Sequence, residues 1–154
     1  MTGVSRLGRI LIFSTIVIGI FMLFTNIFML FPAFFTLQYN NYVTSAVAAY
    51  NNYLTTSDID NCTKVIKDTP MYKRGYITNL DVAAVSMPEG ESLVSTDNTK
   101  PAGTKNRGHE FKVYSNFKFH IKISILGKTA LDAPILLSAE KIVLGTSFYN
   151  DLDD

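Results

Sequence analysis

Few residues of this chain have the types that carry chemistry. It contains one cysteine, Cys62, and two histidines, His109 and His120. Neither histidine stands in a metal-ligand spacing such as His-x-x-x-His or Cys-x-x-Cys. We therefore interpret both histidines as solvated residues and expect no metal site. A lone cysteine forms no intramolecular disulfide, so Cys62 is expected to be a buried, inert thiol.

Two further patterns resemble catalytic or binding motifs. Gly127-Lys128-Thr129 looks like the end of a phosphate loop, but that motif needs a glycine five residues before Gly127, where Lys122 stands. A hairpin turn explains it better. Paired carboxylates occur in polar segments that offer little burial to shift a pKa: Glu89 with Glu91, and Asp151 with Asp153 and Asp154. We predict no catalytic residue, no cofactor, no small-molecule substrate and no enzymatic activity.

The strongest feature is an apolar segment, residues 10–35, that contains no charged side chain and follows Arg6 and Arg9. About 20 apolar residues cross ~30 Å of hydrocarbon as a helix, so this segment is long enough to span. Lysine and arginine next to a span stay cytoplasmic, which predicts a cytoplasmic leader at 1–9 and an extracytoplasmic region at 36–154. The expected anchor residues are Ile10, Phe21, Phe24, Phe28 and Phe35.

Processing of the N-terminus is the alternative to an intact anchor. Ala46-Val47-Ala48 has the small-x-small form that signal peptidase accepts, and a short leader ending near Gly3 or Gly8 is a second option. Signal-peptide cores are about 7 to 15 residues long, shorter than the segment at 10–35. We therefore favour an uncleaved single-pass membrane protein.

The helix is expected to continue beyond the membrane. Tyrosine and small apolar residues recur at spacings of three and four between Tyr39 and Leu54, which predicts an amphipathic stalk. Pro32 is expected to bend this long helix without ending it. The apolar stripe of the stalk needs a partner. Its members are Tyr39, Tyr42, Val43, Ala46, Val47, Tyr50, Tyr53 and Leu54, of which Tyr39, Val43, Val47 and Tyr50 are expected to pack on the sheet.

Residues 117–125 supply that partner, because apolar and polar side chains alternate strictly there, as in a strand buried on one face. Phe117, Phe119, Ile121 and Ile123 are expected to face the stalk. Further strands are predicted at 111–113, with a bend at 115–116, and at 76–78, 80–85, 134–137 and 142–146. Residues 62–66 fit a helix or a strand, 126–129 a turn, and 86–110 a long exposed loop. The prediction is an α+β fold, a long N-terminal helix packed on a small antiparallel sheet.

Charge excludes one class of partner. Without Arg6 and Arg9 the extracytoplasmic region has 12 basic residues against 13 acidic ones. Nucleic-acid binding needs a concentrated basic surface, so we expect no nucleic-acid partner. Membrane lipid, other transmembrane helices and copies of the same chain are the expected partners.

This layout of basic leader, apolar helix, kinking proline, stalk and C-terminal sheet resembles the type IV pilin-like proteins, most of all the TadE-like minor pilins. The resemblance implies a structural subunit of a surface filament or secretion system. Standard pilins carry a glutamate five residues after the processed glycine, whereas this chain has no acidic residue before Asp58. A bitopic accessory protein of a secretion or conjugation channel, binding neighbours through its sheet domain, is the alternative function.

Overall fold

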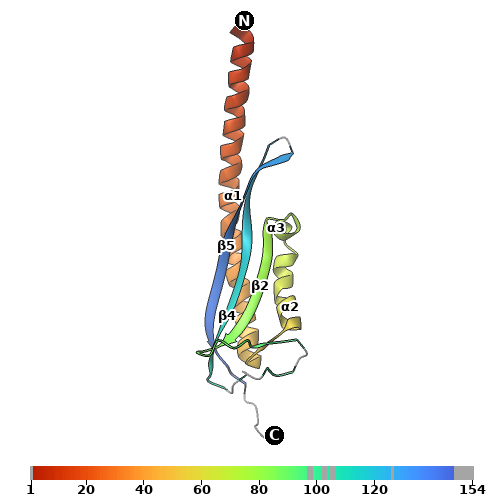
Figure 1. Cartoon of the computed structure of the whole chain (residues 1–154), viewed down its shortest axis with the longest axis vertical. Helices are drawn as coiled ribbons and strands as arrows, with labels where there is room; N and C mark the ends of the chain where they lie inside the picture. Colours follow the sequence, from red (N-terminus) through yellow and green to blue (C-terminus); the bar gives the residue numbers. More distant parts are fainter. Residues whose placement is uncertain (1, 97–98, 102–103, 105–106, 126, 148–154) are drawn as a thin grey trace.

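The computed structural model describes residues 2–96, 99–101, 104, 107–125 and 127–147, and it shows an α+β fold. A long N-terminal helix is followed by a three-stranded antiparallel sheet and a parallel two-stranded pair. Figure 1 shows the helix running alongside the sheet and projecting well beyond it at its N-terminal end. The predicted fold class is therefore confirmed in its broad form.

Helix α1 (Thr2–Asn51) runs through Pro32 as one continuous element. Its 50 residues give a length of about 75 Å. It ends three residues before the predicted Leu54 because Asn52 adopts a positive φ of 61°. Asparagine tolerates this left-handed conformation better than most residues, and it is common just after a helix.

The antiparallel sheet has the order β2-β4-β5, with β4 (Glu110–Ile125) in the centre. The strand predicted at 117–125 is confirmed, and β4 extends it through the expected bend at 115–116. The segments predicted at 134–137 and 142–146 are parts of one 17-residue strand, β5 (Lys128–Leu144). Lys128 and Thr129, expected in the turn, already pair with β4, and Gly127 takes a positive φ of 76° before them.

Strand β2 (Ile77–Ser86) joins the two strands predicted at 76–78 and 80–85. Its register with β4 shifts between Thr78 and Asp81. Asn79 has a φ of 52° at this point, so the strand is locally distorted where the sequence indicated a break. Residues of β2 before and after the shift both pair with β4.

Residues 62–66 are helical, within α2 (Thr56–Lys67). The helix begins at a capping box, in which Asp58 N–H donates to the Thr55 hydroxyl and Thr55 N–H donates to the Asp58 carboxylate, both at 3.0 Å. A second short helix, α3 (Pro70–Lys73), follows with Thr69 as its N-cap and Pro70 in its first turn. The prediction did not include α3.

The segment at 86–110 is only partly an exposed loop. Within it, β3 (Val94–Ser95) pairs in parallel with β1 (Leu54–Thr55). Leu93 is buried, and its N–H donates to the Ala84 carbonyl at 2.8 Å. The prediction of an exposed loop is therefore wrong at this point, because one apolar side chain in a polar segment reaches the core.

The core consists of two buried clusters to which α1 and the sheet both contribute. The first contains Ala33 and Leu37 from α1 with Ile66, Ile77, Phe117, Phe119 and Ala139. The second contains Ala48 from α1 with Leu54, Val82, Ala84, Leu93, Phe111 and Val113. Both clusters hold alternate residues of β4, so they lie on one face of the sheet.

Candidate functional site

The N-terminal half of α1 exposes its apolar side chains. All five expected anchor residues, Ile10, Phe21, Phe24, Phe28 and Phe35, are exposed in the isolated chain. Arg6 and Arg9 are also exposed. Within the described part of the chain one helical segment, Ser5–Asn51, is long and apolar enough to cross a membrane, and a signal sequence near the N-terminus meets the same criterion. Only 6% of its most apolar stretch is buried.

Four exposed aromatic residues stand exactly seven positions apart along α1, and we call them the aromatic seam. They are Phe21, Phe28, Phe35 and Tyr42, each 60–70% exposed. Seven residues fall within about 20° of two full helical turns, so the four rings lie along one side of the helix. The Lys141 ammonium group lies 4.2 Å from the centre of the Tyr42 ring. The seven-residue period of the seam is visible in the sequence, and the predicted anchor residues include Phe21, Phe28 and Phe35 but not Tyr42.

The predicted stalk stripe is wrong for three of its four tyrosines, of which Tyr42 is 60% exposed. Tyr39 is 63% exposed and Tyr50 is 73% exposed, so neither is buried against the sheet. Val43 and Val47 are half-buried, and Val47 packs against the second core cluster. The large rings point away from the sheet because the helix approaches it with a different face.

On β4 the residues predicted to face the stalk have decreasing burial toward the hairpin end. Phe117 and Phe119 are fully buried in the first cluster. Ile121 is partly buried against that cluster, and Ile123 is half-buried. Burial thus alternates along β4 only as far as Phe119, and residues 120–125 are evenly half-buried or exposed.

The buried face of the α1 stalk is made of short and polar side chains. Besides Ala33, Leu37 and Ala48, it contains Asn40, Asn41, Thr44 and Ser45. The Ser115 hydroxyl of β4 donates to the Asn41 side-chain oxygen at 3.0 Å, and the Thr44 hydroxyl donates to the Asn40 carbonyl at 2.8 Å. Short side chains bring the helix backbone closer to the strands than tyrosine would, and the hydrogen bonds of Asn41 and Thr44 offset part of the cost of burying this face. The Asn40 amide nitrogen and the Ser45 hydroxyl have no hydrogen-bond partner among the described residues.

Two asparagines, Asn26 of α1 and Asn52 directly after it, bind backbone groups in the C-terminal half of the chain. Asn26 donates from its amide to the Lys122 carbonyl at 2.8 Å and accepts from the Lys122 N–H at 3.2 Å. Asn52 donates to the Ser147 carbonyl at 2.9 Å and accepts from the Ser147 N–H at 3.1 Å. Each side-chain amide makes the pair of backbone hydrogen bonds that a neighbouring β-strand would make. Asn26 connects the helix to the C-terminal half of the chain near one end of their contact, and Asn52 does so near the other end.

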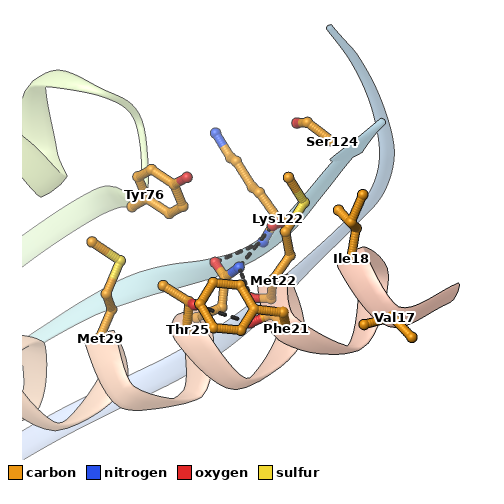
Figure 2. A pocket seen from close by; sticks show the side chains of 10 residues that line it. Val17, Ile18, Phe21, Met22, Thr25, Met29, Tyr76, Lys122 and Ser124 are labelled. Carbon is orange, nitrogen blue, oxygen red and sulfur yellow. Dashed lines mark hydrogen bonds between the residues drawn. The ribbon is translucent and has the colours of Figure 1, made fainter. Parts of the chain in front are cut away.

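An open, apolar cleft of about 520 Å³ lies between α1 and the end of the β4–β5 hairpin. Figure 2 shows Phe21 and Met22 of α1 on one side and Tyr76 and Lys122 across from them. The Lys122 ammonium group donates to the Gly75 carbonyl at 2.8 Å and lies 5.5 Å from the centre of the Tyr76 ring. The cleft therefore has apolar walls with one cation held at its rim.

No protein-family model, curated protein or solved structure matches this chain. Its exposed helix, the seam and the cleft are the features that offer a binding surface.

His120 is less solvated than predicted. Its Nδ1 lies 2.6 Å from an Asp132 carboxylate oxygen, and its Nε2 lies 2.9 Å from the Thr78 hydroxyl. These three residues come from β5, β4 and β2, so a reading of local sequence misses the contact. A hydroxyl, an imidazole and a carboxylate in this order also occur in hydrolases. We interpret them here as a polar link across three strands, because the Asp132 side chain is 41% exposed, whereas the carboxylate of such a catalytic triad is buried.

Cys62 and His109 are the remaining candidates for chemistry. Cys62 is buried and free, as predicted. His109 is half-buried, and its Nε2 is buried with no hydrogen-bond partner among the described residues, so the prediction of a solvated side chain is wrong. Within the described ranges no group of three or more histidine, cysteine, aspartate or glutamate residues is arranged to hold a metal ion.

Proposed function

We propose that this chain is a membrane-anchored, pilin-like structural subunit of the minor-pilin type, with its N-terminus in the cytoplasm and its sheet domain outside. The observation that carries the proposal is the aromatic seam. It starts in the segment that fits a membrane span and ends at Tyr42, in the half of α1 that lies beside the sheet. Lipid accounts for exposed rings at Phe21, but it does not account for Tyr42.

A neighbouring helix accounts for the whole seam. Apolar side chains that repeat every seven residues are typical of helices that pack along one another over several turns. The large exposed area of Tyr39 and Tyr50 extends the same apolar surface toward the domain end of the helix. A subunit that assembles through α1 needs such an exposed surface. At its two ends the seam also meets its own sheet domain, because Phe21 lines the cleft and Tyr42 lies against Lys141 of β5.

The attachment of α1 to its own domain also fits a structural subunit. Asn26, Asn41 and Asn52 connect the helix to the C-terminal half at three levels. Helix and sheet are thereby held as one body, so packing at the seam positions the displayed domain. This stalk-on-sheet arrangement is part of the proposal.

Cross-linking of engineered cysteines in membranes tests it. We expect Phe28→Cys, in the seam, to form cross-linked dimers on oxidation, because seam residues of two copies would meet. Ile12→Cys is the matched control, since Ile12 is 64% exposed and lies about two and a half turns from Phe21, on the opposite side of the helix. Equal cross-linking of both variants, or of neither, contradicts assembly through the seam.

A further inference from the structure

The position of the apolar cleft along α1 relates it to the membrane. A span of about 20 residues that begins after Arg9 ends near Met29. Even a span that begins at Ser5, with both arginines extending to the headgroups, ends near Phe24. Either span includes Val17, Ile18 and Phe21, which line the cleft.

The other wall of the cleft comes from the end of the β4–β5 hairpin. Ser124 and Lys122 line the cleft together with those helix residues. Lys122 is also fixed beside Asn26 through both of its backbone groups. Since the helix residues beside the hairpin end belong to the span, the hairpin end lies at the depth of the lipid.

The hairpin end has an apolar face. Ile121, Ile123 and Ile125 continue the face of β4 that holds Phe119, and Leu131 is paired with Ile123 in the register. Ile125 is 37% exposed and Leu131 is 44% exposed. In Figure 1 the hairpin end extends past α3 along the helix and bends away from it. The core does not cover these side chains, so they offer an apolar surface next to the anchor.

We propose that the end of the β4–β5 hairpin is a second membrane contact, immersed at the boundary between headgroups and acyl chains, with lipid acyl chains filling the cleft. The inference rests on the membrane anchoring in the proposed function. Lys122, at the rim of the cleft and further from the hairpin end, places a cation toward the lipid phosphates. Lys128, exposed at the hairpin end, has a long side chain that extends its ammonium group toward the headgroups. Asn26 hydrogen-bonds both the N–H and the carbonyl of Lys122 on one edge of β4. Because these two backbone groups are paired, bringing that edge near lipid costs less free energy.

The absence of tryptophan from the chain allows a direct test, because any introduced tryptophan is the only one. The full-length chain is reconstituted into phosphatidylcholine–phosphatidylglycerol vesicles whose acyl chains carry bromine, which quenches tryptophan fluorescence on contact. Leu131→Trp and Ile125→Trp report on the hairpin end. Phe24→Trp is the positive control within the anchor. Ile142→Trp, at a 55% exposed position near the other end of β5, is the negative control for a tryptophan surrounded by water.

We expect both hairpin variants to lose fluorescence in brominated vesicles to an extent close to that of Phe24→Trp, while Ile142→Trp keeps its fluorescence. Quenching of Phe24→Trp with no quenching of either hairpin variant overturns the inference and leaves the anchor intact. No quenching of Phe24→Trp overturns the membrane anchoring itself, and the inference with it.

Discussion

Asn26 of α1 binds both backbone groups of Lys122 in β4, donating to its carbonyl at 2.8 Å and accepting from its N–H at 3.2 Å. Strand β2 ends its pairing with β4 at Ile77, which lies opposite Phe119. Beyond that point the side chain of Asn26 takes over part of the role of a neighbouring strand. A polar residue in the middle of an apolar helix thus has a specific structural use.

Replacing Asn26 by leucine is expected to loosen this junction. The change removes two hydrogen bonds, each worth about 0.5–1.5 kcal/mol net, so hydrogen exchange at the Lys122 amide should accelerate by about tenfold or more. Thr25→Val is the control, because the Thr25 hydroxyl bonds only to Phe21 within the helix among the contacts described. Unchanged exchange at Lys122 in the Asn26 variant contradicts the role assigned to the side-chain amide.

Adjacent asparagines in the stalk offer a matched pair. Asn41 and Asn40 are both buried, but Asn41 accepts from Ser115, whereas the Asn40 amide nitrogen has no hydrogen-bond partner in the described structure. Asn41→Leu should lower the free energy of unfolding by about 1–3 kcal/mol, because it leaves the buried Ser115 hydroxyl unpaired. Asn40→Leu should leave it unchanged or raise it. Denaturant unfolding in detergent micelles measures both, and equal losses would refute the assigned difference.

The corrected stalk face predicts a contrast between Leu37 and Tyr39. Leu37 is fully buried, so Leu37→Ala should cost about 2–5 kcal/mol of unfolding free energy. Tyr39→Ala should change it by less than about 0.5 kcal/mol, because the ring is mostly exposed. Thermal or denaturant unfolding of the two purified variants provides the comparison. A larger loss of unfolding free energy for the Tyr39 variant would instead support the prediction from the sequence that the tyrosine is buried against the sheet.

Topology is testable with one engineered thiol. Glu91 is exposed in the segment between β2 and β3, and the natural Cys62 is buried, so Glu91→Cys should dominate labelling. A membrane-impermeant maleimide should label this variant on intact cells if the C-terminal domain is outside. Labelling only after lysis would reverse the proposed orientation.

Much of the fold follows from local patterns in the sequence. The strict alternation at 117–125 predicted β4, and the apolar segment at 10–35 predicted the long helix. The start of α2 was also readable, since Thr55 and Asp58 have the spacing of a capping box, but we left residues 62–66 undecided. In these cases each signal depends on residues a few positions apart.

The stalk face could not be read in the same way. Spacing and hydrophobicity predicted that the stripe containing the tyrosines is buried, whereas the structure buries the asparagine, serine and threonine side chains that stand between its members. Which face of the helix is buried depends on Ser115, which is 74 residues from Asn41 in the sequence. The hydrogen bond from Ser115 to Asn41 lowers the free-energy cost of burying a polar face. The link of His120 to Thr78 and Asp132 depends on strand register in the same way.

The recovery of the full-length chain in surface filaments tests the central claim most directly. Filaments are sheared from cells, freed of membrane lipid and probed for the wild-type chain and for a Phe28→Ala, Phe35→Ala variant. We predict that the wild-type chain is present in the filaments, and that the seam variant stays in the membrane fraction because it has lost packing surface on α1. Recovery of the wild-type chain only in membranes, from cells shown to make filaments, would contradict the subunit and favour an accessory protein of a channel.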